Sequence, residues 1–299
     1  MSEVDSFEHF VITRYFVRFN EKANDRDAKL RASPGWLENR LELFKKFCLP
    51  SVTAQSIQNF RWLIYFDEDV PANYLAQVRA LTSVHKNIEI ITCRFFNTEL
   101  LVSSVRSYLD SNTKWVLTTR LDNDDGWHRD FVKILHTQLQ FEQREFLNFP
   151  VGVIYYSDRT YLYKHPSNAF ISFLERSDNF LTVWCGQHLY LDRVAPVRQL
   201  PTFPAFLQAV HSQTQSNKPR GVRVHRILAL QGFEAMTQLF EQPSKETDLS
   251  ILLDNMTSVA KWAARDRAIA LIRAMAQKIV NFGSGGARFA KLVRPPTRD

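Results

Sequence analysis

Apolar runs and helical patterns alternate at short intervals through the first half of the chain. Runs rich in β-branched and aromatic residues predict strands at 9–19, 61–69, 88–96 and 114–122. Apolar positions at helical spacing predict helices at 36–49, 71–84, 99–111 and 129–143. Pro50 predicts the end of the first helix, and Pro71 predicts the start of the second. This alternation is typical of a doubly wound α/β sheet, which places its ligands at the carboxyl ends of the strands.

The pattern changes after Phe146. Three stretches in the second half are β-rich with few helical patterns between them, namely 146–158, 159–165 and 180–192. Residues 204–240 are mixed and rich in loop signals. We therefore predict a main domain at 1–244 with halves 1–145 and 146–244, a helical segment at 245–282 and a loose tail at 283–299.

Composition refines this picture in three places. The 299 residues suffice for one large α/β domain or two small ones, and the 23 phenylalanines predict an aromatic core. The chain shows neither an apolar run of a membrane span's length nor the pattern of a signal peptide at its start. Cys48, Cys93 and Cys185 are widely spaced and odd in number. They predict reduced thiols and, with them, a cytoplasmic protein.

The net charge of +7 belongs to the C-terminal end. Residues 259–299 hold nine Lys/Arg and two Asp/Glu, whereas the 29 basic and 29 acidic residues of the remaining chain cancel. The body of the protein is therefore not predicted to bind nucleic acid.

The basic residues after Arg288 predict peripheral contact with anionic lipid headgroups at the inner membrane. Between 261 and 280, basic and apolar residues interleave around a helical wheel, whereas a helix that lies on a membrane separates the two faces. The contact is thus expected from the tail alone. Co-sedimentation with anionic vesicles that survives deletion of residues 283–299 would refute it.

A cluster of acids follows the fourth predicted strand in "WVLTTRLDNDDGW", residues 115–127. Asp122, Asp124 and Asp125 place three carboxylates in four positions, where they repel one another unless a positive charge lies between them. Asp122 and Asp124 share one side of an extended chain and can hold a divalent cation such as Mg²⁺ or Mn²⁺. The alternative is a plain turn, with Asp125 as the cap of the next helix. The spacing does not match an EF-hand.

Several stretches resemble a known family. "HFVITRYFVRF", "FKKFCLPSV", "NFRWLIYFD", "WVLTTRLDNDD" and "FISFLER" are similar to the bacterial family of putative rhamnosyltransferases, a branch of the GT-A glycosyltransferases. The resemblance extends from about His9 to about Gly221 and is most specific at Thr-Arg-Leu-Asp-Asn-Asp-Asp. It implies a GT-A-like, Rossmann-type mixed sheet flanked by helices, here with a C-terminal helical extension.

The resemblance also implies an activity. Such an enzyme is a metal-dependent hexosyltransferase of polysaccharide biosynthesis, and it moves a sugar, with rhamnose a candidate, from a dTDP-, UDP- or GDP-linked donor. The acceptor is a hydroxyl of a glycan or a lipid-linked glycan. Residues 1–145 would bind the nucleotide and residues 146–244 the acceptor. Asp122 and Asp124 would form the family's Asp-x-Asp motif, which holds Mg²⁺ or Mn²⁺ against the donor diphosphate.

The resemblance also implies residues that bind the donor. Thr13, Arg14 and Asp67 lie at the ends of the first strands, where the family binds the nucleotide; Asp67 is equally suited to a turn. Arg120 either contacts the diphosphate or pairs with the neighbouring aspartates.

A late histidine completes the metal site in many relatives, within a sequence like His-Gly-x-Asn. His211 in "VHSQTQSN" matches the histidine, although the glycine is missing. The alternatives are His225, His188 and a purely structural histidine.

Glu175 in "FISFLER" matches the family's general base, which takes the proton of the acceptor hydroxyl. The alternatives are Asp178, Asp192 and a solvated ion pair between Glu175 and Arg176. The aromatic candidates for stacking on a sugar, or for simple core packing, are Trp184, Tyr161 and Tyr163.

Two other functions compete with this one. A metal-dependent phosphohydrolase also ends a strand in an Asp-x-Asp pattern, and phosphate release without a sugar acceptor would favour it. A non-catalytic nucleotide-sugar-binding protein would bind its ligand without metal and without turnover.

Overall fold

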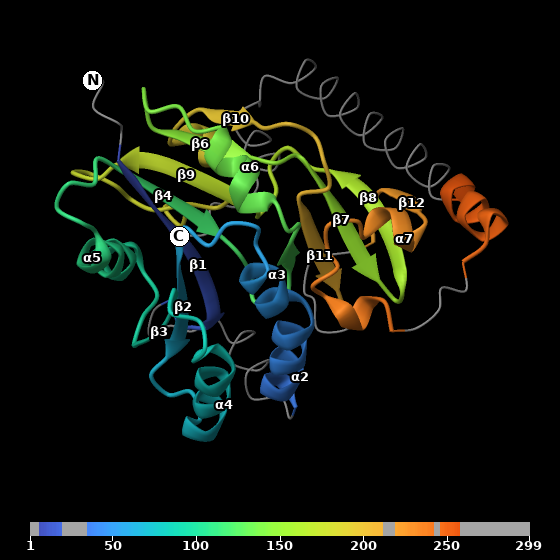
Figure 1. Cartoon of the computed structure of the whole chain (residues 1–299), viewed down its shortest axis with the longest axis horizontal. Helices are drawn as coiled ribbons and strands as arrows, with labels where there is room; N and C mark the ends of the chain where they lie inside the picture. The colour runs from blue at the N-terminus through green and yellow to red at the C-terminus, as the bar shows by residue number, and fades with distance from the viewer. Residues whose placement is uncertain (1–5, 20–34, 212–218, 242–245, 258–299) are drawn as a thin grey trace, which may run out of the picture. The chain divides into compact units, whose positions relative to one another are not determined.

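The computed structural model describes residues 6–19, 35–211, 219–241 and 246–257 (Figure 1). The chain divides into two compact units, Met1–Lys245 and Glu246–Asp299. In the second unit, residues 248–257 form a helix. The predicted continuation of that helix to residue 282 and the basic tail at 283–299 lie outside the described residues. None of the described helices combines the length and apolar content that a membrane span needs.

Seven strands form the first sheet, in the order β10-β6-β9-β4-β1-β2-β3. Their bounds are β1 Phe7–Phe16, β2 Arg61–Asp67, β3 Ile88–Cys93, β4 Trp115–Arg120, β6 Glu145–Asn148, β9 Ile171–Arg176 and β10 Val197–Gln199. Strands β1 to β4 run parallel, so their carboxyl ends share one edge. Strand β9 is antiparallel to β4 and β6. The predicted fold class, a Rossmann-type mixed sheet of GT-A-like order flanked by helices, is confirmed.

The helices follow the predicted spacing, with one correction. Their bounds are α2 Trp36–Leu43, α3 Leu49–Thr53, α4 Ala72–Thr82, α5 Thr98–Tyr108 and α6 Phe131–Thr137. The first helix does not end at Pro50, because a π-helical turn, η1 (Phe44–Cys48), connects α2 to α3. Pro50 lies in the first turn of α3, where a proline interrupts no hydrogen bond.

The second sheet has the order β12-β8-β7-β11-β5. Its strands are β5 Gly126–Trp127, β7 Val151–Tyr156, β8 Arg159–Lys164, β11 Phe206–Val210 and β12 Val222–Val224. Short helical turns accompany it as η2 Leu191–Arg193, α7 Arg226–Ala229 and η3 Thr237–Leu239. Because β4 belongs to the first sheet and β5 to the second, the acidic run Asp122–Asp125 is the passage between them. Gly126 follows this run, and a Cβ there would lie 3.1 Å from the Phe47 carbonyl oxygen and would displace the Met236 side chain.

The stretch 180–192, predicted to be β-rich, forms turns and η2 instead. Side chains take the backbone N–H groups that a sheet would need. The N–H groups of Leu181 and Thr182 donate to Glu175, and that of Val183 donates to Thr118 Oγ1. A strand is lost because local side-chain acceptors replace a neighbouring strand.

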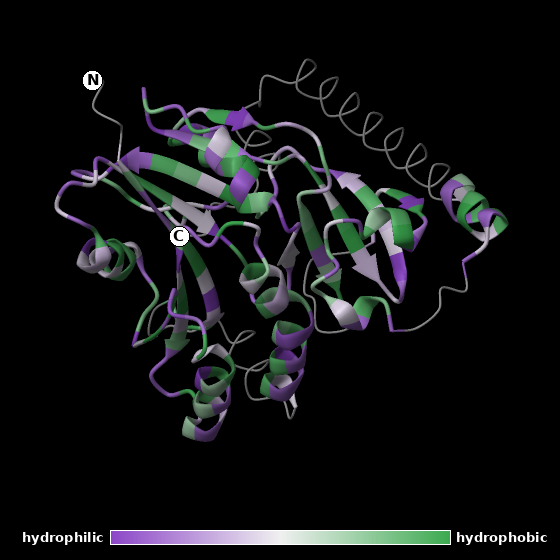
Figure 2. Ribbon diagram, viewed as in Figure 1, coloured by the Kyte–Doolittle hydropathy of each residue, from purple (hydrophilic) through white to green (hydrophobic). Residues whose placement is uncertain are grey.

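The predicted aromatic core is present. The largest fully buried side chains are all aromatic, among them Trp62, Trp127, Phe44 and Phe173. Figure 2 shows hydrophobic residues along the strands of both sheets, whereas helix α2 is largely hydrophilic. The three cysteines are free thiols, as predicted.

Candidate active site

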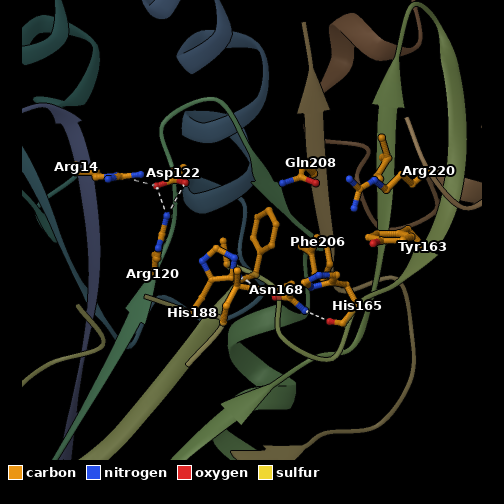
Figure 3. A pocket seen from close by; sticks show the side chains of 14 residues that line it. Arg14, Arg120, Asp122, Tyr163, His165, Asn168, His188, Phe206, Gln208 and Arg220 are labelled. Carbon is orange, nitrogen blue, oxygen red and sulfur yellow. Dashed lines mark hydrogen bonds and ion pairs between the residues drawn. The ribbon is translucent and has the colours of Figure 1, made fainter. Parts of the chain in front are cut away.

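The side chains at the carboxyl ends of β1 and β4 converge on Asp122. The two strands are adjacent and parallel, with Ile12 opposite Arg120. Two residues beyond this pair, Arg14 meets Asp122, with Arg14 Nε 3.5 Å from Asp122 Oδ1. Arg120 approaches the other oxygen, with its Nη2 3.1 Å from Asp122 Oδ2. Figure 3 shows the resulting arrangement, in which two guanidinium groups hold one carboxylate.

These arginines fix the charge state of Asp122. Burial alone would raise the pKa of this carboxyl, but Arg120 and Arg14 outweigh it and keep the pKa well below its usual range. The indole of Trp184 supports both arginines, because its ring centroid lies 4.0 Å from the Arg120 guanidinium carbon and 4.8 Å from that of Arg14. Trp184 therefore stacks on two arginines in the structure, and its stacking on a sugar remains untested.

Asp124 faces a different set of partners. Its Oδ2 lies 2.6 Å from Arg40 Nη1 on α2 and 3.0 Å from His211 Nε2 after β11. Burial opposes ionisation, yet the hydrogen bond from His211 and the charge of Arg40 lower the pKa of Asp124. The structure thus brings the predicted pair Asp124 and His211 together. Of the alternative histidines, His188 lines the cavity described below and His225 precedes α7.

Asp125 is the third carboxyl of the run and is neither exposed nor a helix cap. Its Oδ1 accepts the backbone N–H of Ala209 on β11 at 2.9 Å, and α6 begins only at Phe131. Burial raises the pKa of Asp125 well above its usual range, and the charges of Asp124 and Asp122 add to this. Crowding of three carboxyls is therefore tolerated because arginines pair with Asp122 and Asp124, whereas Asp125 accepts a backbone N–H from β11.

The donors for a divalent cation are present in part. Asp124 Oδ2 and His211 Nε2 are 3.0 Å apart. This separation is the hydrogen bond between the two groups, so a shared cation would take the place of the proton between them. Within the described residues, no group of three or more His, Cys, Asp or Glu side chains is arranged to hold a metal. The pair fits Mg²⁺ or Mn²⁺ as a two-residue site that a substrate phosphate completes.

Two of the predicted nucleotide contacts, Thr13 and Asp67, have protein partners in the structure. Thr13 is fully buried, and its Oγ1 accepts the indole N–H of Trp62 at 2.9 Å. Because neighbouring strand residues face opposite sides, the Thr13 side chain lies in the core while Arg14 reaches the site, and a ligand contact of Thr13 stays a prediction. Asp67 ends β2 at the ligand-bearing edge, where Arg18 Nη2 donates to its Oδ1 at 2.9 Å. A role of Asp67 towards the nucleotide stays a prediction.

Glu175 does not lie in the site. It pairs with Val116 near the start of β4, at the opposite end from Asp122, and is 1% exposed. Its two oxygens accept the backbone N–H groups of Leu181 and Thr182, each at 2.9 Å. In the structure Glu175 anchors the loop that carries Trp184 and His188 and does not line the cavity, and its role as the general base stays a prediction. The alternatives Asp178 and Asp192 are exposed and do not line the cavity.

A cavity of about 410 Å³ opens beside Asp122, between the ends of β1 and β4 and the second sheet. Its described lining is Arg14, Arg120, Asp122, Ile154, Tyr163, His165, Asn168, Ala169, Phe170, His188, Leu189, Phe206, Gln208 and Arg220. Among these residues Asp122 is the one carboxylate. Tyr163, a predicted stacking residue, faces the cavity, whereas Tyr161 packs in a small buried cluster.

Sequence reasoning missed Arg40, His165, Gln208 and Arg220. Arg40 stands on the hydrophilic helix α2, and its partner Asp124 lies 84 residues further along the chain. Asn168 shapes the turn behind His165, since its Nδ2 donates to the His165 carbonyl at 2.9 Å. The asparagine in a polar turn was the one local signal for this part of the wall.

Comparison with known proteins adds a family match. A family model described as "Putative rhamnosyl transferase" matches residues 7–223. No curated protein sequence matches the chain.

Solved structures with similar chain folds are distant. S. aureus TarS 1-349 in complex with UDP-GlcNAc is 9% identical with a TM-score of 0.45, covering 69% of this chain and 60% of that one. A putative nucleotide-diphospho-sugar transferase from Desulfovibrio desulfuricans G20 is 11% identical with a TM-score of 0.35, covering 65% and 80%. The chain thus spans about three fifths of the TarS fragment.

Proposed function

This chain belongs to the putative rhamnosyl transferase family, and from that premise we propose that it is a glycosyltransferase using a nucleotide-diphosphate sugar. The acceptor would be a hydroxyl of a glycan or a lipid-linked glycan, in polysaccharide biosynthesis at the cytoplasmic side of the membrane. The observation that carries the proposal is the convergence of Arg14, Arg120 and Asp122 at the mouth of the cavity.

Arg14 and Arg120 suit a diphosphate. Guanidinium groups donate paired hydrogen bonds to phosphate oxygens, and Trp184 already holds both in place. Their positions at the carboxyl ends of adjacent parallel strands are where α/β sheets of this kind bind ligands. A donor there would direct its sugar into the cavity beside Asp122.

Asp124 and His211 would hold Mg²⁺ or Mn²⁺, with Asp122 close by. When bound, the cation would neutralise charge on the diphosphate. With or without the cation, Arg40 keeps Asp124 ionised and oriented, and the backbone N–H of Ala209 holds Asp125 against β11 by a hydrogen bond.

The reaction needs one bond made and one broken. The acceptor oxygen bonds to the anomeric carbon as the bond from that carbon to the diphosphate oxygen breaks, and the electron pair leaves with the diphosphate. Arg14 and Arg120 would stabilise the negative charge that grows there. On the described cavity wall, His188 lies near Arg120, and burial lowers its pKa, so its ring is neutral and its unprotonated nitrogen can accept the hydroxyl proton.

A thermal-shift panel tests this function. UDP, GDP and dTDP are each added with and without Mn²⁺, and one of them should stabilise the full chain by about 3 kcal/mol when present at about 100 times its dissociation constant. The matching nucleoside monophosphate is the control and should stabilise less, because it lacks the second phosphate for Arg14 and Arg120. If no diphosphate raises the melting temperature with or without Mn²⁺, the proposal fails.

A further inference from the structure

The cavity has a second polar end, opposite the Asp122 end. This distal cluster consists of Tyr163 on β8, His165 after it, Gln208 on β11 and Arg220 before β12. Figure 3 shows Arg220 and Tyr163 across the cavity from Arg14 and Asp122, with the Arg220 guanidinium directed toward its interior. All four residues belong to the half of the chain that was predicted to bind the acceptor.

The positive charge of Arg220 is not balanced by the cavity wall. Within the described residues, no ion pair or hydrogen bond engages its guanidinium, and the single carboxylate of the wall, Asp122, is held by Arg14 and Arg120. The sequence of the preceding segment, 212–218, contains no Asp or Glu. The distal cluster therefore presents a net positive charge toward the space that the acceptor would fill.

The neighbours of Arg220 add hydrogen-bond donors rather than compensating charge. Burial and the charge of Arg220 lower the pKa of His165, so its ring is neutral and can donate one N–H. The Tyr163 hydroxyl and the Gln208 amide offer further donors. The Tyr163 and His165 rings lie 5.6 Å apart, with their planes tilted by 32°, and form an aromatic wall beside them.

We propose that the distal cluster binds an oxyanion, a carboxylate or a phosphate, on the acceptor, with Arg220 as the residue that selects it. Neutral sugar hydroxyls do not require a guanidinium, whereas an oxyanion accepts its paired N–H groups and neutralises its charge. The acceptor is then an acidic or phosphorylated glycan rather than a neutral one. This inference rests on the proposed function, because that function places the donor at the Asp122 end.

The test compares three probes that differ in one substituent: methyl glucuronoside, methyl glucoside 6-phosphate and neutral methyl glucoside. Binding to the full chain is measured by calorimetry in the presence of the stabilising nucleoside diphosphate. At least one anionic probe should bind at least tenfold more tightly than the neutral one, and the stronger of the two identifies carboxylate or phosphate. Equal binding of all three probes, or no binding by either anionic probe, overturns the proposal.

Variants assign the effect to Arg220. Arg220→Gln should lose at least tenfold in affinity for the preferred anionic probe, with unchanged affinity for the neutral probe and an unchanged nucleotide thermal shift. Arg220→Lys should recover part of the loss, because it restores charge without the paired N–H groups. Arg79→Gln, on the exposed face of α4, is the matched control. If Arg220→Gln weakens nucleotide binding instead of probe binding, the assignment of Arg220 to the acceptor is overturned. If the anionic probes bind but no nucleoside diphosphate stabilises the chain, the proposed function alone is refuted.

Discussion

Replacing Asp122 or Asp124 by Asn will lower sugar transfer on the order of 10²- to 10³-fold with the fold intact, a loss typical of removing a group that acts on transition-state charge. Asn has the shape of Asp but no charge. At Asp122 it removes the carboxylate that positions Arg14 and Arg120, and at Asp124 it removes the partner of His211 and Arg40. The measurement is release of nucleoside diphosphate with donor and acceptor present.

The two variants should differ toward metal. High Mn²⁺ should partly restore Asp124→Asn, because His211 remains, but it should not restore Asp122→Asn, whose defect lies in the arginines. Asp125→Asn is the matched control: this buried side chain accepts the Ala209 N–H, an amide oxygen can accept the same hydrogen bond, and the variant should retain transfer. Transfer at the original rate in both Asp122→Asn and Asp124→Asn would contradict the site, and phosphate release without an acceptor would favour a phosphohydrolase.

The sequence was most informative about elements whose signal lies within one continuous stretch of residues. The inner strands of the first sheet are buried on both faces, so continuous apolar runs such as 62–66 predict them, and helical spacing predicts α4 and α5. The acidic run was visible because like charges in adjacent positions need an explanation. Its partners are distant in sequence: His211, 87 residues away, is indicated by the family resemblance alone, and Arg40, 84 residues away, has no signal in the sequence.

Two predicted site residues, Thr13 and Glu175, lie away from the cavity for the same reason. The family resemblance points to Thr13 by its place at the end of the first strand and to Glu175 by a motif, and neither states which face of a strand or which end of a sheet a side chain occupies. One residue separates Thr13 in the core from Arg14 in the site. Glu175 lies at the far end of β9, where its register opposite Val116 depends on a pairing between distant segments. In both cases the pairing of strands in three dimensions determines where the side chain lies.

The anchor role of Glu175 leads to a pH-dependent effect on stability. Burial raises the pKa of this carboxyl to about 7 from its ordinary value of 4.5, although the N–H groups of Leu181 and Thr182 oppose the shift. The folded chain therefore binds this proton more tightly than the unfolded chain. Its contribution to the free energy of unfolding is complete below pH 4.5 and is lost as the pH rises through about 7, to a total of about 3 kcal/mol.

Glu175→Gln removes that dependence, because Gln does not titrate. The difference in unfolding free energy between the original chain and Glu175→Gln, measured by denaturant titration from pH 4.5 to 8, should fall with rising pH. Buried His9 and His136 contribute with the opposite sign: burial lowers the pKa of both, to about 4 for His136, so stability rises with pH below 6.5. Both forms share these histidines, and the difference cancels them.

Glu175→Gln should also reduce the activity of the site. Gln has one oxygen for two backbone N–H groups, so either Leu181 or Thr182 loses its acceptor and the loop that holds Trp184 against Arg14 and Arg120 loosens. Transfer should fall about tenfold, chiefly through weaker donor binding, since the loss of one charge-assisted hydrogen bond is worth about 1.5 kcal/mol or more. Asp178→Asn, an exposed carboxylate in the same loop, is the control and should change neither quantity. A Glu175→Gln chain with the original pH slope would show that Glu175 does not titrate in this window. Loss of catalytic rate with unchanged donor binding would return it to the role of general base.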